Sequence, residues 1–191
     1  MTPEELAAAR DRILEDVIAD GLSVLFCGIN PGLMSAFTGH HFARPGNRFW
    51  PALHASGFTP RRFAPGEQRE MLTLGLGITN VVGRATARAD ELSPRELVEG
   101  GRRLTAKVER YRPAWLAVLG VTAYRVAFAE KRAQVGPQDT VIGGTRVWVL
   151  PSPSGLNAHW TPTQLAAEFA RLRAAASDDA PLPHGHDELE R

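Results

Sequence analysis

The chain has 191 residues, of which 43% are hydrophobic and 23% are charged, and its formal net charge at pH 7 is +1. This length and composition indicate a globular chain with one sizeable core, and they exclude collagen-like and strongly charged disordered proteins. The single cysteine excludes an internal disulfide framework and fits a reducing compartment. No apolar run is long enough to cross a membrane, and the N-terminus is too charged for a signal peptide, so we expect a cytoplasmic protein without a membrane partner.

The first half of the chain contains alternating helical and strand patterns. Apolar residues at helical spacing predict a helix over residues 4–20, and the apolar run over 22–29 predicts a strand buried on both faces. A long loop follows that strand and leads into a predicted helix over 48–57. Further patterns predict a helix over 67–74 and a second buried strand over 76–82.

The second half continues this alternation. Ser93-Pro94 combines an N-cap residue with a proline at the first helical position, which predicts a helix from Pro94 to about Tyr111. The remaining predicted elements are a strand over 115–120, a helix over 121–128, two strands within 139–151 that are joined at Gly143-Gly144, and a helix over 161–176.

Strands that alternate with helices predict a single-domain, three-layer α/β/α sandwich around a mainly parallel sheet, which we place at residues 1–176. Residues 177–191 contain five acids and one base, and we expect them to form a disordered tail. Without that tail the net charge is +5, and nearly all the bases are arginine, which is compatible with binding to nucleic acid but does not establish it.

Three unusual loops follow strands of the predicted sheet. They read "NPGLMSAFTGHHF" after the first strand, "GRATARAD" after the second and "PSPSGLNAHW" after the last. Ligands of α/β proteins bind at the carboxyl ends of the strands, so we expect these loops to form the functional site. Asn-Pro-Gly is also a common turn, so the first loop alone leaves open whether Asn30 turns the chain or takes part in chemistry.

Two motifs at opposite ends of the chain resemble one known family. "GINPG", followed by "TG-x-x-F-x-x-P-x-NRFW", and the later "VLPSPSGL" are similar to the motifs of mismatch-specific uracil/thymine DNA glycosylases, which belong to the uracil-DNA glycosylase superfamily. The resemblance extends from about residue 22 to residue 176 and includes "GGRRL" at a matching position. It implies an enzyme that flips uracil out of DNA and hydrolyses its N-glycosidic bond with water.

The resemblance assigns roles to residues after the first two strands. Asn30 corresponds to the asparagine that positions the hydrolytic water, an amide that can orient water but is a poor general base. Phe42 corresponds to the aromatic residue that stacks on the flipped base, and Gly32 lets the backbone approach that base. The remaining residues that the resemblance places in the base pocket are Ile29, Ser35 and Asn80.

The resemblance also assigns a wedge to the last loop. Leu156 would fill the space that the flipped base leaves, and an exposed leucine in a loop of Ser, Gly and Asn is consistent with that role. The residues assigned to the wedge and to contact with the opposite base are Ser152, Ser154, Gly155, Leu156 and Asn157. Uracil-specific relatives have a histidine where this chain has Leu150. We therefore do not expect this motif to stabilise a uracil anion through a histidine side chain.

Neither motif supplies a carboxylate, although a cationic sugar would be stabilised by one. Asp90 is the best placed acid, because its loop ends at the same sheet edge, and we hypothesise that it orients water or stabilises charge. An alternative reading is that Asp90-Glu91 only prepares the start of the next helix.

We interpret His40 and His41 as loop residues near DNA. Arg44 and Arg48 are read either as phosphate contacts or as solvated side chains.

The sequence therefore predicts a monofunctional glycosylase of uracil in double-stranded DNA, preferentially in G·U mismatches, that works as a monomer without a cofactor or metal. Whether thymine or other damaged pyrimidines are also substrates is left open. Two alternatives remain from other classes of protein. One is a catalytically silent binder of DNA lesions, and the other is a nucleotide-hydrolysing α/β enzyme, although no P-loop or dinucleotide fingerprint is present.

Overall fold

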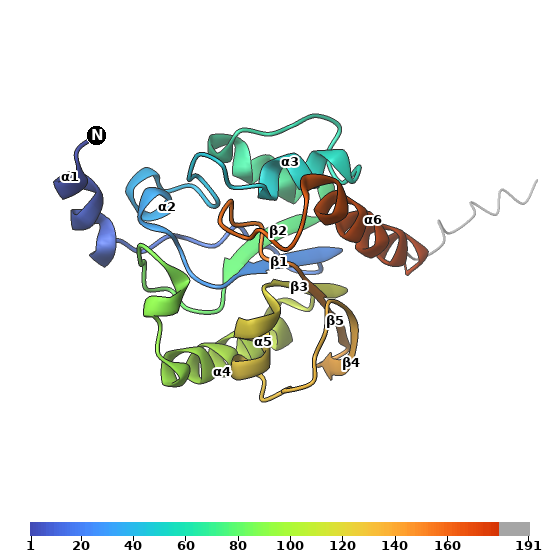
Figure 1. Ribbon diagram of the computed structural model, residues 1–191. Helices are drawn as coiled ribbons and strands as arrows, with labels where there is room; N and C mark the ends of the chain where they lie inside the picture. The colour runs from blue at the N-terminus through green and yellow to red at the C-terminus, as the bar shows by residue number, and fades with distance from the viewer. Residues whose placement is uncertain (180–191) are drawn as a thin grey trace, which may run out of the picture.

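A five-stranded sheet runs through the middle of the computed structural model, which describes residues 1–179 (Figure 1). The strand order is β2-β1-β3-β5-β4, and all neighbouring pairs are parallel except β4 and β5. The strands are β1 Val24–Gly28, β2 Leu76–Asn80, β3 Trp115–Leu119, β4 Gly136–Ile142 and β5 Thr145–Leu150.

Helices cover both faces of this sheet, as Figure 1 shows, with α3 and α6 on one face and α4 and α5 on the other. The α-helices are α1 Pro3–Ala7, α2 Leu33–Thr38, α3 Phe49–Ala55, α4 Pro94–Tyr111, α5 Val121–Ala127 and α6 Pro162–Asp178, and the 3-10 helices are η1 Ala8–Asp11, η2 Pro65–Leu74 and η3 Ala89–Glu91. The predicted three-layer α/β/α fold with a mainly parallel sheet is confirmed. No helix of the described residues has the length and apolar character that a membrane span requires.

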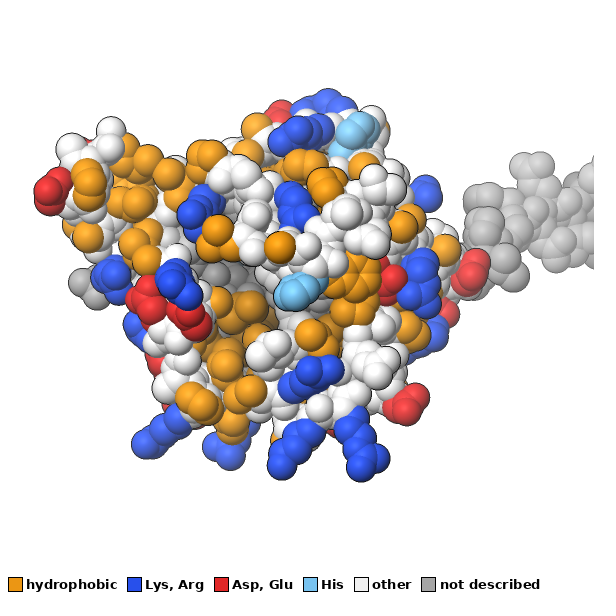
Figure 2. All heavy atoms as spheres, in the orientation of Figure 1, with side chains coloured by type: hydrophobic (Ala, Val, Ile, Leu, Met, Phe, Trp, Pro, Cys, Tyr) orange, Lys and Arg blue, Asp and Glu red, His pale blue; other side chains and the backbone are white. Residues whose placement is uncertain are grey.

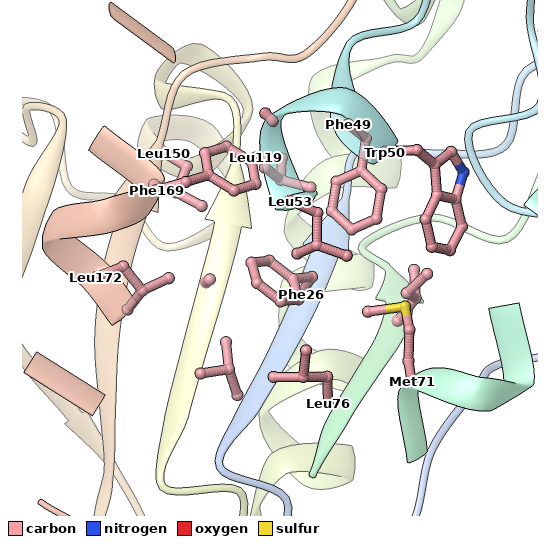
Figure 3. Packing of buried hydrophobic residues seen from close by; sticks show 14 of the residues in the cluster. Phe26, Phe49, Trp50, Leu53, Met71, Leu76, Leu119, Leu150, Phe169 and Leu172 are labelled. Carbon is pink, nitrogen blue, oxygen red and sulfur yellow. The ribbon is translucent and has the colours of Figure 1, made fainter. Parts of the chain in front are cut away.

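The central strand β1 is buried on both faces, as its continuous apolar sequence predicts. Phe26 belongs to the core on the α3 and α6 side, whereas its neighbours Leu25 and Cys27 belong to the core on the α4 and α5 side. Figure 3 shows Phe26 between the side chains of α3 and α6, and its ring centroid lies 5.4 Å from that of Phe49 and 5.9 Å from that of Phe169. These contacts fix β1, and therefore the loop that leaves it.

Helix α4 packs unusually close to the backbone of its neighbours. A Cβ atom on Gly100 would lie 2.4 Å from the carbonyl oxygen of Val81, and one on Gly101 would lie 2.4 Å from that of Ala127. Only glycine permits such an approach, which explains the paired glycines of "GGRRL". The helix thereby supports the segment that follows β2.

The predicted helix over residues 4–20 is wrong beyond its first part. Helix α1 ends at Ala7 and η1 at Asp11, and the chain is then extended, with Val17 forming an antiparallel bridge to Ile78. The two main-chain hydrogen bonds of that bridge have N···O distances of 2.9 and 2.7 Å. Ile13, which the helical pattern would bury, is 89% exposed. Pairing with β2 has overridden local helical propensity here.

Most other predicted elements agree with the structure to within a few residues. Helix α4 begins at Pro94 behind a capping box formed by Ser93 and Glu96, as the sequence predicts. The long loop after β1, however, contains helix α2, and the predicted helix over 67–74 is a 3-10 helix. Helix α6 continues to Asp178, beyond the predicted boundary at residue 176, and residues 180–191 of the predicted tail lie outside the described residues.

Candidate active site

The three loops selected from the sequence meet around one cavity of about 700 Å³ at the carboxyl ends of the parallel strands. Figure 2 shows that this face of the molecule is hollowed near its middle, between hydrophobic side chains and scattered Lys and Arg side chains. A cavity of this size is typical of ligand sites. The predicted site residues that line it are Ile29, Asn30, Gly32, Ser35, Phe42, Asn80, Asp90, Ser152, Ser154 and Leu156, whereas Gly155 and Asn157 do not.

The side chain of Asn30 is held by the loop that follows β2. Its Nδ2 donates to the carbonyl oxygen of Arg84 at 2.9 Å and to Oγ1 of Thr86 at 2.8 Å. A carbonyl oxygen can only accept, so the atom that faces Arg84 must be the amide nitrogen. Oδ1 of Asn30 has no hydrogen-bond partner among residues 1–179, so it can accept a hydrogen bond from a molecule in the cavity.

Main-chain bonds join the same two loops. The carbonyl oxygens of Ile29 and Pro31 accept from the N–H groups of Val82 and Thr86, at 2.9 and 3.1 Å. These bonds make the peptide around Asn30 an extension of the sheet rather than a free turn. Sequence reasoning missed Thr86 and Arg84 as supports of Asn30, although it placed their loop at this edge.

The floor of the cavity is formed where Asn80 and Phe42 approach Gly28. A Cβ atom on Gly28 would lie 2.6 Å from Oδ1 of Asn80 and 3.3 Å from Cζ of Phe42, so a side chain at this position would displace both. Phe42 has a φ of 53° and stacks on Phe49, with ring centroids 4.1 Å apart. A left-handed conformation is costly for a bulky residue and persists where its surroundings impose it.

His41 is one of those surroundings. It lies in the loop after α2, as predicted, and it lines the cavity as a buried side chain, while its proximity to DNA stays a prediction. It is 1% exposed, its main-chain N–H donates to Oε1 of Gln68 at 2.7 Å, and its Nε2 lies 2.9 Å from the carbonyl oxygen of Glu15. Because that carbonyl only accepts, Nε2 carries the proton and Nδ1 is left to accept from Nδ2 of Asn80, 3.4 Å away. Burial lowers the pKa of His41, which keeps the ring neutral.

Ser35 of α2 is buried, and it connects this helix to the Phe42 segment. Its Oγ accepts from the main-chain N–H of Ala43 at 3.2 Å. The hydroxyl thus lines the cavity and also fixes the chain beside Phe42.

The loop from β5 to α6 exposes Leu156 at the edge of the cavity, with 70% of its surface accessible. The polar side chains around it are used within the loop. Nδ2 of Asn157 donates to the carbonyl oxygen of Ser152 at 3.0 Å, and its Oδ1 accepts from the main-chain N–H of His159 at 3.2 Å. Asn157 therefore shapes the loop that presents Leu156.

Asp90 lies on η3 and lines the same cavity, as its loop position predicts. Its carboxylate forms an ion pair with Arg88, and its side chain is 63% exposed. The alternative reading, in which Asp90-Glu91 prepares the next helix, is not supported, because Ser93 and Glu96 cap α4 and Glu91 binds the main-chain N–H of Arg88. Among residues 1–179, no three His, Cys, Asp or Glu side chains gather as a metal site would require.

The N-terminal segment supplies two lining residues that sequence reasoning did not select, Leu6 and Leu14. The segment is docked on α2 through Arg12, whose Nη1 donates to the carbonyl oxygen of Phe37 at 3.0 Å. It is also tethered to η3 by an ion pair between Arg10 and Glu91 at 3.3 Å. Because the sequence predicted a continuous helix over residues 4–20, it did not predict that this segment reaches the cavity.

A model of the uracil DNA glycosylase superfamily matches residues 15–175. The chain belongs to the uracil DNA glycosylase superfamily. Membership supports an enzyme that hydrolyses glycosidic bonds in DNA, and the family match includes the loops after β1, β2 and β5. It begins after Leu6 and Leu14, so the N-terminal wall of the cavity lies outside it.

The fold is also similar to a solved structure. The solution NMR structure of a Methanosarcina acetivorans protein, provisionally assigned as a uracil DNA glycosylase, matches with a TM-score of 0.56 and 19% sequence identity. The match covers 85% of this chain and 98% of the other. At this level of identity the likeness establishes a shared fold.

Proposed function

We propose that this protein is a monofunctional DNA glycosylase that extrudes uracil from double-stranded DNA, preferentially from G·U mismatches, and hydrolyses its N-glycosidic bond. Superfamily membership supports the reaction, and the resemblance of both motifs to mismatch-specific members supports the substrate. One observation carries the proposal furthest. The nitrogen of Asn30 is tied to Arg84 and Thr86, which leaves its Oδ1 as an acceptor at the cavity.

The chemistry follows from what a fixed amide can do. As the bond between C1′ and the base lengthens, positive charge develops on the sugar and the electron pair leaves with uracil. Water then forms the new bond to C1′, and the proton that it loses passes to the departing uracil anion or to bulk solvent. A neutral amide cannot take up that proton readily, so Asn30 would act by holding the water in line with C1′. Such a mechanism predicts a modest rate.

The other lining residues have supporting roles in this proposal. Phe42 would stack on the extruded base, and the amide of Asn80 would hydrogen-bond its edge. Leu156 would occupy the space in the duplex that the base has left. Asp90 would stabilise the cationic sugar or orient the water, because it is a carboxylate at the same cavity.

The enzyme would be monofunctional because a bifunctional glycosylase needs an amine to attack the sugar. None of the residues that line the cavity within the described chain is a lysine. Lys107 is held elsewhere, where it pairs with Asp16 and donates to Thr79 at 2.9 Å.

The test is a cleavage assay on labelled duplexes containing G·U, A·U and G·T pairs and on single-stranded uracil DNA, with and without alkali. We expect strand breaks only after alkali, with G·U cleaved fastest. Breaks without alkali would contradict a monofunctional enzyme, and equal rates on G·U and A·U would contradict mismatch preference. Tight binding to G·U without any abasic product would instead identify a silent lesion binder.

A further inference from the structure

Arg48 lies beneath the β5–α6 loop and binds that loop through four hydrogen bonds. Its main-chain N–H donates to the carbonyl oxygen of Pro153 at 2.9 Å. Its guanidinium donates to the carbonyl oxygens of Ser154 and Asn157, both at 2.9 Å, and to that of Trp160 at 2.5 Å. In the sequence, two of these acceptors precede Leu156 and two follow it. Neither sequence reading of Arg48, as a phosphate contact or as a solvated side chain, describes this arrangement.

The partners of Arg48 are unusual for a half-buried cation. Among residues 1–179 it forms no ion pair with a carboxylate, and its Nε atom is buried without a hydrogen-bond partner. Removing a guanidinium from water without a carboxylate is costly, so the bonds to the loop must offset that cost. A charged donor to a carbonyl is among the stronger hydrogen bonds in proteins, and the planar fork of arginine can bind several carbonyls at once.

The loop itself has little regular structure to hold it. Residues 151–160 form turns but no helix or strand. Its tip is closed against the loop before α3, where a Cβ atom on Gly155 would lie 2.7 Å from the carbonyl oxygen of Gly46. Arg48 is the N-cap residue of α3, and α3 packs on the core through Phe49 and Leu53. The arginine therefore connects an irregular exposed loop to the rigid part of the molecule.

We propose that Arg48 is a positioning residue that holds Leu156 at the mouth of the cavity before DNA binds, so that the wedge is preformed. This inference rests on the proposed function, because it assigns a role to the wedge of that reaction. A preformed wedge does not need to be ordered when the base flips, which lowers the cost of extrusion. Loss of Arg48 should therefore lower the rate of base flipping and cleavage more than the affinity for duplex DNA.

The experiment compares Arg48→Ala, Arg48→Lys and Arg125→Ala with the unmodified protein. Arg125 is a matched control, since its Nε donates to the carbonyl oxygen of Ala133 at 2.8 Å in a part of the fold that does not line the cavity. Three quantities are measured on a G·U duplex: the single-turnover cleavage rate, the half-saturating enzyme concentration, and the fluorescence of a 2-aminopurine beside the uracil, which increases when the base leaves the stack.

We expect Arg48→Ala to lower the maximal rate roughly thirtyfold, to reduce the fluorescence change, and to alter the half-saturating concentration less than threefold. Arg48→Lys should recover part of the rate, because an ammonium group can still donate to some of the carbonyls, and Arg125→Ala should match the unmodified protein. A second comparison uses Leu156→Ala. If Arg48 acts through Leu156, adding Arg48→Ala to Leu156→Ala should lower the rate much less than it does alone.

The outcomes separate this inference from the proposed function. If the unmodified protein neither cleaves nor flips uracil, the proposed function fails. If it does both and Arg48→Ala is equally active, the positioning role fails. A loss of rate that is as large in the Leu156→Ala background as in the unmodified protein would also contradict it, since the arginine would then act independently of the wedge. Thermal unfolding of each variant identifies a general loss of fold, and the lysine variant tests the role if the alanine variant is unstable.

Discussion

The amide nitrogen of Asn30 lies 2.8 Å from the hydroxyl oxygen of Thr86, a residue 56 positions later in the chain. The hydroxyl of Thr86 donates in turn to the carbonyl oxygen of Arg88 at 2.7 Å, so its lone pair is directed to Asn30. Thr86 is 1% exposed, and its contact with Asn30 is part-buried at the wall of the cavity. The direction in which Asn30 presents its oxygen is therefore determined by the loop after β2.

Thr86→Val should lower the single-turnover rate on G·U DNA about five- to tenfold, because valine keeps the shape of threonine but loses one of the two bonds that fix Asn30. A neutral hydrogen bond contributes about 1 kcal/mol, which sets the size of the effect. Thr105→Val is a suitable control, since Thr105 bonds the carbonyl oxygen of Gly101 within α4, away from the cavity. A Thr86→Val enzyme with the full rate would show that Asn30 does not need this support.

Two glycines of the site should respond differently to alanine. A Cβ atom on Gly32 would meet nothing within 4 Å, so Gly32→Ala should leave the free energy of unfolding nearly unchanged and lower cleavage by obstructing the approach of the base. Gly28→Ala would press on Asn80 and Phe42, and overpacking of this kind typically costs about 1–3 kcal/mol of stability. Urea unfolding and cleavage assays on both variants measure this difference. Full activity in Gly32→Ala would contradict close approach of the base at that position.

The stability of the protein should fall in mild acid because of His41. Burial lowers the pKa of this ring in the folded state, whereas in the unfolded chain it titrates near its ordinary value of about 6.5. Below that value the unfolded chain binds a proton that the folded protein does not. The free energy of unfolding therefore falls as the pH falls from about 6.5 towards the lower folded-state pKa, by up to about 1.4 kcal/mol per pH unit.

Urea unfolding of the unmodified protein and of His41→Gln between pH 5 and pH 8 measures that contribution. Glutamine does not titrate, so the variant should show a shallower dependence on pH over the acid part of the range, even if it is less stable throughout. Parallel curves for the two proteins would show that His41 contributes nothing to the acid sensitivity.

Asp90→Asn should lower the maximal rate of cleavage and leave the free energy of unfolding almost unchanged, because the carboxylate lines the cavity while its ion pair with Arg88 is exposed. We expect a loss of roughly tenfold if the charge stabilises the sugar in the transition state. Arg88→Ala tests the pairing separately, since it removes the partner and keeps the acid. An Asp90→Asn protein that retains full single-turnover cleavage would eliminate this role.

The sequence predicts those parts of the fold whose signals are local or continuous. The apolar run around Phe26 predicts a strand buried on both faces, and Ser93-Pro94 predicts the first residue of α4. The meeting of three loops at one cavity follows from the rule that parallel strands end at the same sheet edge. Membership of the superfamily was indicated by two motifs that lie far apart in the chain.

The features that the sequence did not predict depend on contacts with residues far apart in the chain. Many of these contacts are to main-chain groups, which no residue type reveals. Residues 12–19 have helical spacing, but Val17 pairs with the main chain of Ile78, and Asp16 binds Lys107 and Thr79. The acceptors of Arg48 are all main-chain carbonyls, which any sequence in the loop would supply. The burial of His41 was not predicted, because its acceptor, the carbonyl of Glu15, belongs to the segment whose extended path was missed.

The role of Asn30 is tested by the single-turnover rate of Asn30→Ala on a G·U duplex, measured with binding to the same duplex and with thermal unfolding. We expect a fall in rate of about a hundredfold or more, because a water that is no longer held in line with C1′ reacts far less often. Affinity for the duplex should change little, since the wedge and the stacking residue remain. A folded Asn30→Ala protein that cleaves G·U DNA as fast as the unmodified protein would contradict the assignment of this site.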